Sequence, residues 1–268
     1  MAKKTSKVWI PFLIYAIVYF LIAVVLKRQD IAWLNLELFS LVLSVSLLIK
    51  HHFPGKNGII LSSFVTVIYL ISRIYTFNVF SLLQAAGLFL SAAASCRVFE
   101  IYPEDSLKWI RGRNWKNAAL SLLIGTGTGL LLGFVNYLLM RGSNPRAEED
   151  VLKAFITSMD PATMEEISCR TVFYAFCLAG IGGKLTGKFQ KFTGWFMMTV
   201  PHILPHISAD FSHGILSMLL SWLIMLILYV LIFGIAFVFL QKKRDIVSAM
   251  TAHGIVDFIR FMLFGVPH

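Results

Sequence analysis

The sequence contains few charged residues. Asp, Glu, Lys and Arg make up 14% of its 268 positions, whereas 57% of the residues are hydrophobic. Soluble domains carry about 25% charged residues, so this composition excludes an ordinary soluble domain. Long apolar runs, separated by short polar segments, fill most of the chain. The sequence therefore predicts an all-α membrane protein that crosses the cell membrane several times.

Cysteine and the common metal motifs are also scarce. The three cysteines lie in or beside apolar runs, which argues against a disulfide framework and against a CxxC metal site; they are Cys96, Cys169 and Cys177. The sequence has no HExxH motif, no internal repeat of the kind found in secondary transporters, and no nucleic-acid motif. The net charge of +10 is explained by basic loops on the cytoplasmic side of a membrane.

The apolar runs predict eight or nine transmembrane helices with an intramembrane polar cavity. The first run, from Val8 to Leu26, follows a lysine-rich start and is expected to be a retained signal anchor. We expect N-terminal transmembrane helices over 1–140, a polar loop or amphipathic segment over 141–160, and a C-terminal core of helices over 161–268. A nine-helix count places every basic loop on the cytoplasmic side; these loops are 50–57, 97–117, 184–191 and 242–244.

One apolar run, from Ala118 to Met140, is rich in glycine. Its glycines are Gly125, Gly127, Gly129 and Gly133. Small residues four apart allow two membrane helices to approach closely. We therefore expect this helix to pack tightly against a neighbour.

The apolar run that ends near Gly182 begins with two carboxylates and a guanidinium. An acidic or basic residue at the centre of a membrane span costs about 2.5–3.5 kcal/mol on insertion scales, so such residues usually have a function. Glu166 and Arg170 are four residues apart and can pair on one helix face, whereas Glu165 points about 100° away. One carboxylate is therefore expected to be structural and the other available for chemistry. The alternative is an interfacial helix start at Asp160-Pro161, where the helix dipole favours acidic residues.

Histidines occur at helical spacing in two later segments. His202 and His206 share one face of a segment interrupted by Pro201 and Pro205, and His253 shares a face with Asp257. A lone intramembrane histidine is most often a hydrogen-bonded core residue. Convergence on one site is favoured here because all these groups lie in the last part of the chain. His213 is a weaker candidate at a helix entry.

These motifs resemble the CPBP (CAAX protease and bacteriocin-processing) family of intramembrane endopeptidases. The family pattern is EExxxR, then FxxxH, then HxxxN or HxxxD, on separate helices. It is matched here over about 161–264 by Glu165-Glu166-x-x-x-Arg170 and His253-x-x-x-Asp257. The middle motif departs from the pattern, because none of the candidates His202, His206 and His213 has phenylalanine four residues earlier. His206, with Pro201 five residues before it, is the first choice for that histidine and His202 the second.

The resemblance implies a proteolytic mechanism. Glu165 and the middle histidine would activate a water molecule that attacks a peptide carbonyl, and a glutamate in a poorly solvated cavity suits that work. His253 would stabilise the oxyanion, with Asp257 behind it as its orienting partner or in a protonated form. Glu166 and Arg170 would hold the helix that carries Glu165.

Several alternatives remain open at this stage. A metal-free mechanism is favoured, but zinc held by His202, His206 and His253, with Glu165 as base, is the rival. The irregular middle motif would also fit a catalytically inactive scaffold or regulator of the same fold, and buried Glu, His and Arg also serve proton-coupled transporters. The expected partners are the lipid bilayer and a peptide or membrane-protein substrate. For the protease, we expect Glu165, His206 and His253 around one cavity.

Overall fold

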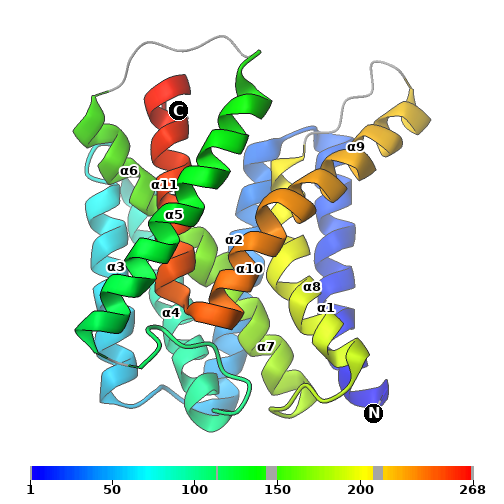
Figure 1. Cartoon of the computed structure of the whole chain (residues 1–268). Helices are drawn as coiled ribbons and strands as arrows, with labels where there is room; N and C mark the ends of the chain where they lie inside the picture. Colours follow the sequence, from blue (N-terminus) through cyan, green and yellow to red (C-terminus); the bar gives the residue numbers. More distant parts are fainter. Residues whose placement is uncertain (1, 113, 143–149, 208–213, 267–268) are drawn as a thin grey trace. The chain divides into compact units, whose positions relative to one another are not determined.

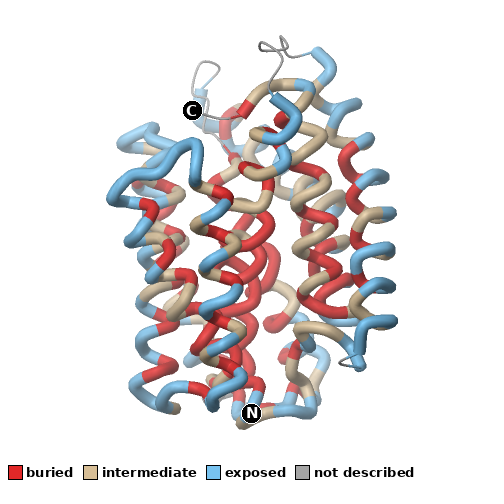
Figure 2. Tube along the Cα trace, turned by 90° about the vertical axis from the view of Figure 1, so that its left-hand side faces the viewer, coloured by how far each residue is buried: buried red, intermediate tan, exposed pale blue. Residues whose placement is uncertain are grey.

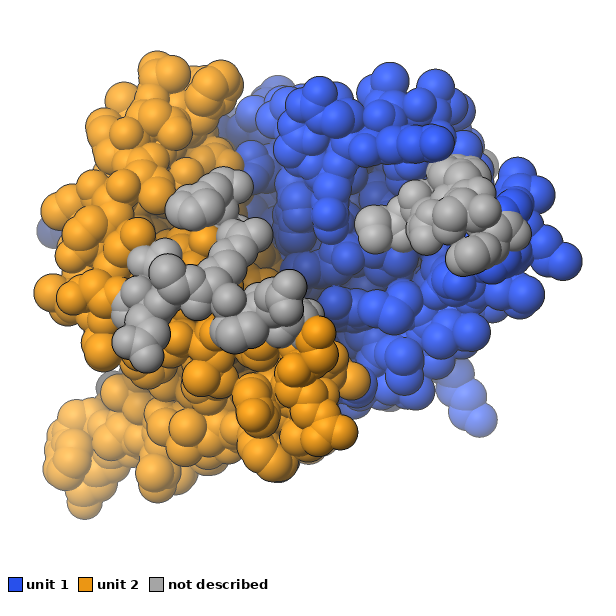
Figure 3. Space-filling view, turned by 90° about the horizontal axis from the view of Figure 1, so that it is seen from above, with its two compact units in different colours: residues 1–59, 90–106, 168–236 blue, residues 60–89, 107–167, 237–268 orange. Residues whose placement is uncertain are grey.

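The chain folds into helices that form two compact units. The computed structural model describes residues 2–112, 114–142, 150–207 and 214–266, and every regular element in these ranges is a helix (Figure 1). Figure 3 colours the two units separately. Unit 1 comprises 1–59, 90–106 and 168–236, and unit 2 comprises 60–89, 107–167 and 237–268. The units interleave along the sequence, so neither coincides with a predicted sequence block, and each is described by itself.

Six helices of the described residues are long and apolar enough to cross a membrane. They are Thr5–Leu26, Gln29–His51, Val79–Ile101, Trp115–Met140, Ile215–Arg244 and Ile246–Phe264. The predicted all-α membrane architecture agrees with these helices, but the count of eight or nine spans is not confirmed.

Three segments of the predicted nine are not among the six. Helix α3 (Lys56–Ser72) has 17 residues, which at about 1.5 Å per residue is shorter than the ~30 Å hydrocarbon core. Helix α8 (Lys188–Ile203) has 16 residues and is similarly short. The helix that begins at Val151 carries both glutamates and Arg170 in its apolar part. Helix α3 is apolar but too short, α8 is not among the apolar helices, and the third segment carries three charged residues in its apolar part.

Unit 1 is organised around α7 (Val172–Ile181). Eight of its ten residues are buried, and it packs against α1 (Ala2–Leu21), α2 (Gln29–His51) and α8. The trace coloured by burial shows such continuous buried stretches next to helices on which buried and exposed turns alternate (Figure 2). The other elements in unit 1 are η1 (Ile22–Leu26), η3 (Leu204–His206), α9 (Ile215–Tyr229), η4 (Val230–Gly234) and most of the C-terminal half of α4 (Val79–Ile101).

Unit 2 is organised around α11 (Ile246–Phe264), which packs against α5 (Trp115–Met140) and α6 (Val151–Glu166). The predicted glycine packing is found on the α5–α11 contact. A methyl group added at Gly125 would lie 2.6 Å from the Ser248 carbonyl oxygen, and one at Gly129 would lie 2.6 Å from Ile255 Cβ. Gly127, on another face of α5, has nothing within 4 Å. The glycines four residues apart therefore hold α11 close to α5.

The expected helix start at Asp160-Pro161 is wrong. Helix α6 begins ten residues earlier, where the Asp150 side chain accepts a hydrogen bond from Lys153 N at 2.9 Å, and Pro161 lies inside it. Asp160 does not cap a helix but pairs with Arg73 at 2.7 Å. The packing of α6 against α11 overrides the local start signal, because burial of a helix face outweighs the single hydrogen bond that an internal proline removes. The amphipathic segment and the Glu-Glu segment are thus one helix.

Candidate functional site

The predicted site residues are divided between the two units. Glu165, Glu166, His253 and Asp257 belong to unit 2, whereas Arg170, His202 and His206 belong to unit 1. Since Glu165 and His206 lie in different units, their pairing stays a prediction. His213 lies outside the described residues.

In unit 2, both ring nitrogens of His253 face carboxylates. Nδ1 lies 2.8 Å from Glu166 Oε1, and Nε2 lies 3.4 Å from both Glu165 Oε2 and Asp257 Oδ2. The histidine side chain is 8% exposed. Nδ1 is within hydrogen-bond distance of Glu166, whereas Nε2 lies farther from the carboxylates of Glu165 and Asp257. The imidazole is thus enclosed by acids on both sides.

Glu166 is the fixed carboxylate of this cluster. It is fully buried, and its second oxygen, Oε2, accepts a hydrogen bond of 2.7 Å from Gln241 Nε2. Gln241 Nε2 also lies 3.3 Å from the Glu166 carbonyl oxygen. Each carboxylate oxygen therefore has a buried donor, and Glu166 fixes the orientation of the His253 ring through Nδ1.

Arg170, the expected partner of Glu166, lies in unit 1. Its Nη1 donates a hydrogen bond to the Met198 carbonyl oxygen at 3.2 Å, and the residue is 1% exposed. Arg170 itself lies in a π-helical turn, η2 (Ile167–Thr171), which directly follows Glu166. The predicted Glu166–Arg170 pair stays a prediction, and the contacts shown for Glu166 are those with His253 and Gln241.

Glu165 is the more accessible of the two glutamates. Its side chain is 17% exposed, compared with 0% for Glu166. Its 3.4 Å distance to His253 Nε2 exceeds the ~2.7–2.9 Å of a charge-assisted hydrogen bond. Glu165 is therefore more exposed than Glu166 and lies farther from the imidazole, and its expected role as the reactive carboxylate stays a prediction.

Two further contacts complete the cluster. The Phe237 ring stacks on the His253 ring, with centroids 4.7 Å apart and planes at 14°. Asp257 Oδ1 forms an ion pair of 3.0 Å with Arg260 Nη2. Asp257 was expected behind His253 as the orienting group, but it lies on the Nε2 side together with Glu165, and Glu166 holds the opposite nitrogen. Asp257 thus links the imidazole to a guanidinium.

Local helix geometry brings these side chains together. His253 and Asp257 lie one turn apart on α11, whose start is capped by Asp245 accepting from Ser248 N at 2.9 Å. Gln241 lies in a second π-helical turn, η5 (Leu240–Arg244), directly before α11. π-Helical turns add one residue to a helix and are frequent at functional sites. Here one follows Glu166 and the other presents its partner Gln241.

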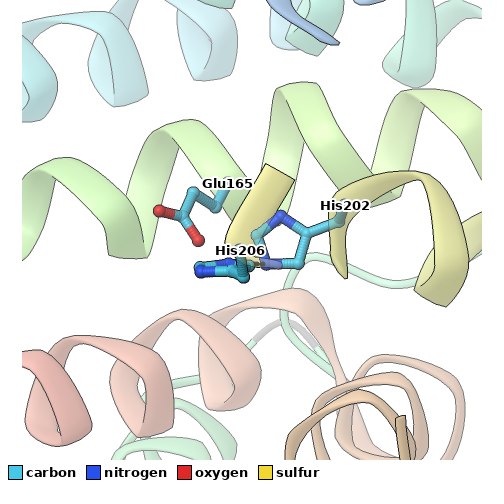
Figure 4. A group of neighbouring side chains, drawn as sticks. All are labelled: Glu165, His202 and His206. Carbon is cyan, nitrogen blue, oxygen red and sulfur yellow. Dashed lines mark hydrogen bonds between the residues drawn. The ribbon is translucent and has the colours of Figure 1, made fainter. Parts of the chain in front are cut away.

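In unit 1, His202 and His206 face one another at the end of α8. Their Nε2 atoms are 3.4 Å apart, and their ring planes are inclined at 77°. Figure 4 shows these two imidazoles and also labels Glu165, a residue of unit 2. Trp33 packs edge-on against both rings, with centroids 6.0 and 4.8 Å away, and Tyr229 stacks on His206. This histidine pair is therefore enclosed by aromatic rings.

The turn that carries His206 is held by side chains from the first two helices. Pro201 lies near the end of α8 and Pro205 lies in η3, which follows it, and prolines and helix ends leave carbonyl oxygens without intrahelical donors. The donors are Tyr15 to the Pro201 carbonyl at 2.8 Å, Tyr19 to Leu204 at 2.5 Å and to Ile207 at 3.1 Å, and Gln29 to Pro205 at 2.9 Å. These bonds replace the missing helical ones and fix the backbone at His206.

No match to a known protein was found. No protein-family model matches the chain, and neither curated proteins nor solved structures match it. The likeness to the CPBP family therefore rests on the sequence motifs alone, and the functional argument rests on the side chains.

The zinc alternative can be compared with the donor atoms of each unit. Two nitrogens 3.4 Å apart have the spacing of two ligands on a tetrahedral zinc ion with Zn–N bonds of about 2.0–2.1 Å. His202 and His206 thus fit a metal as two donors, but a catalytic zinc takes about three protein ligands. His253, the third predicted donor, has carboxylates at both nitrogens. The zinc alternative therefore stays a prediction, with His202 and His206 as two donors in unit 1.

Three residues of the unit 2 cluster were missed by sequence reasoning. Gln241 precedes Lys242-Lys243-Arg244, which was interpreted only as a topology signal. Phe237 belongs to a long apolar run and carries no distinguishing pattern. Arg260 could have been found, because it lies three residues after Asp257 on the same helix.

Proposed function

We propose that the protein is an intramembrane endopeptidase of the CPBP or CAAX-protease type, with Glu165 as general base. The observation that supports this best is the pair of unequal glutamates at His253. One carboxylate is fully buried and fixed by two donors, whereas its neighbour in sequence is partly exposed and lies 3.4 Å from the other ring nitrogen. A general base must be within hydrogen-bond reach of the water it deprotonates, and the partly exposed carboxylate is the more accessible of the two.

Each residue of the unit 2 cluster has a role in the proposed reaction. Glu165 removes a proton from water, whose oxygen attacks the carbonyl carbon of a peptide bond, and Glu165 then returns that proton to the leaving amine as the C–N bond breaks. His253 offers its Nε2–H to the carbonyl oxygen as negative charge develops there, a task that requires a donor already fixed in place. Glu166 and Phe237 supply that fixation by holding Nδ1 and one face of the ring. Asp257 and Arg260 extend the polar surface along α11.

The middle histidine is assigned from the motif order. His206 is the proposed partner of Glu165, and His202 is the second candidate. The uncharged rings of Trp33 and Tyr229 pack against this histidine pair. A neutral imidazole can accept a proton from water, so such surroundings suit a second proton acceptor.

The substrate class follows from the position of the cluster. His253 and Asp257 lie within a helix that is long and apolar enough to span a membrane. The proposed substrate is therefore a peptide or membrane protein whose cleaved bond reaches the apolar layer. No cofactor is required in this mechanism.

A comparison of membrane peptides between variants tests the proposal. Cells that produce wild-type protein and cells that produce Glu165→Gln are compared for new peptide termini by mass spectrometry. Loss of a general base lowers proteolysis by about 10²- to 10⁴-fold, so the products are expected to disappear in Glu165→Gln. Glu37→Gln, in α2 of unit 1, is the matched control because it removes one acid from another apolar helix. Unchanged products in Glu165→Gln, with both variants folded, would exclude Glu165 as the base.

The histidine assignment has its own test. His206→Ala and His202→Ala are compared in the same assay, and the larger loss is expected for His206→Ala. A larger loss for His202→Ala would transfer the role to His202 without affecting the proposal for Glu165.

A further inference from the structure

Five exposed cations gather where α5 and α11 begin. They come from the loop before α5, from the first turn of α5 and from η5, and are Lys108, Arg111, Lys116, Lys242 and Lys243. These segments are separated by up to about 130 residues in the sequence, but hydrogen bonds within unit 2 join them directly. We call this surface the basic rim.

Buried Asp245 ties the basic rim together. Its Oδ2 accepts hydrogen bonds from Arg111 N at 3.0 Å and from Ser121 Oγ at 2.6 Å, and the residue is 0% exposed. Backbone bonds reinforce this connection, because Ile246 N donates to the Lys108 carbonyl at 2.8 Å. The loop and the start of α11 are therefore fixed to each other.

Two arginines of this region point in different directions. Arg244 is turned inward, where its Nη2 donates to the Asn117 carbonyl at 2.7 Å and its Nε lies 3.1 Å from Ser121 Oγ. Arg111 is exposed, and its Nη1 donates to the Lys243 carbonyl at 2.7 Å. The inner guanidinium thus joins η5 to α5, whereas the outer one is held beside the Lys243 backbone.

The charge of the basic rim is nearly all positive. In the described residues of 107–117 and 242–247, Asp245 is the single acid, and it is buried in the contacts above. Trp115, next to Lys116, is 75% exposed at the start of a candidate span. Exposed tryptophans at span ends lie at the level of the lipid headgroups. The basic rim therefore faces the layer in which lipid phosphates are found.

We propose that the basic rim of unit 2 is a binding site for the phosphates of anionic lipid headgroups. Positive charges on several fixed segments complement a cluster of phosphates, and each Lys or Arg near an anionic surface contributes about 1 kcal/mol. The site is independent of the proposed peptidase activity. The contacts of Asp245 and Arg244 fix the segments that carry these cations, and this fixed arrangement distinguishes the site from a general excess of basic residues.

Lipid binding to the full-length protein in detergent tests this proposal by native mass spectrometry. Phosphatidylglycerol is the anionic probe and phosphatidylcholine the neutral one. Wild-type protein is expected to retain phosphatidylglycerol more tightly. Lys243→Gln and Arg111→Gln should each weaken its binding by about fivefold, the factor that corresponds to about 1 kcal/mol. The matched control is Lys188→Gln with Lys191→Gln, which removes two exposed cations from α8 in unit 1.

Asp245→Asn distinguishes a built site from charge alone. This change makes the protein more positive, so binding through net charge would become tighter. If the geometry matters, binding becomes weaker because the loop is released from α11. Should Asp245→Asn fail to fold, Ser121→Ala removes one of its hydrogen bonds without changing charge and should also weaken binding.

Three results would overturn the proposal. They are equal retention of both lipids, an equal loss of phosphatidylglycerol in the α8 control, and tighter binding by a folded Asp245→Asn protein. Displacement of the lipid by inorganic phosphate at equal concentration would also contradict a lipid site.

Discussion

The histidines of the two units differ in what surrounds them. In unit 2, His253 has carboxylates at both ring nitrogens, 2.8 Å from Nδ1 and 3.4 Å from Nε2. In unit 1, His202 and His206 face each other and are packed by Trp33 and Tyr229. The same side chain is therefore a fixed donor in one unit and a potential acceptor in the other.

The two regions are also stabilised in different ways. Unit 2 holds its histidine through buried charged groups, which are costly when a partner is removed. Unit 1 holds its histidines through a backbone turn whose carbonyls accept from Tyr15, Tyr19 and Gln29. Removal of the buried Glu166 in unit 2 should therefore act mainly on folding, whereas removal of a donor in unit 1 should act mainly on the local position of His206.

The largest effect is expected for Glu166→Gln in unit 2. The amide can no longer accept from both Gln241 and His253, and breaking a buried charged contact costs about 3–5 kcal/mol. The folded yield and the unfolding midpoint in detergent should both fall. Glu165→Gln, the neighbouring control, should leave both nearly unchanged. Equal destabilisation by the two substitutions would contradict the division into a structural and a reactive glutamate.

Gly129→Val should come next. The added Cβ would lie 2.6 Å from Ile255 Cβ, so α11 must move away from α5, and overpacking of this kind costs about 1–3 kcal/mol. The unfolding midpoint should fall, together with peptidase activity that depends on His253. Gly127→Val is the matched control, since nothing lies within 4 Å of that position. If both valines have the same effect, helix propensity rather than helix contact determines it.

A smaller effect is expected for Tyr19→Phe in unit 1. The change removes the single hydroxyl hydrogen shared by the Leu204 and Ile207 carbonyls, and because Ile207 N still donates to the Leu204 carbonyl at 3.1 Å, the loss is about one hydrogen bond, roughly 0.5–1.5 kcal/mol. The NMR signals of His206 should shift while those of His253 stay in place. Tyr75→Phe, an exposed tyrosine of unit 2, serves as the control. Equal shifts at both histidines would show that the two regions do not respond separately.

The smallest effect is expected at the surface of unit 1. Lys184 Nζ lies 2.7 Å from Glu104 Oε2, and this ammonium lowers the pKa of the Glu104 carboxyl from its ordinary value of 4.5. Because the folded pKa lies below the unfolded one, the pair contributes stability above about pH 4.5 and loses it as the pH falls through the folded value. Glu104→Gln should lower the unfolding midpoint slightly at pH 7 and not at pH 3. A difference of the same size at both pH values would contradict this origin.

Helical periodicity predicted what lies on one helix, and these predictions agree with the structure. The run Ile246–Phe264 is α11 with those bounds, and the glycines four apart on α5 face that helix. His253 and Asp257 share a face because their spacing is one turn. Such patterns depend only on local geometry, which the sequence determines directly.

Contacts between distant residues could not be predicted in this way. Gln241 and His253 reach Glu166 across 75 and 87 residues, and no period in the sequence connects them. The Asp160-Pro161 signal failed for the opposite reason, because packing outweighed a correct local preference. Residue spacing predicts which side chains share a helix face, but the element that packs against that face depends on the whole fold.

The capping of the His206 turn by the first two helices has a consequence for synthesis. Tyr15 and Tyr19 precede their acceptors by 186 and 185 residues, and Gln29 precedes its acceptor by 176. At a translation rate of about 5–20 residues per second, the acceptor carbonyls are synthesised roughly 10–40 s after these donor side chains. Helices α1 and α2 are therefore already synthesised when the segment whose carbonyls they bind is made. A chain released before residue 207 would present the donors without their complete set of acceptors, and a chain without α1 would present the acceptors without two of their donors.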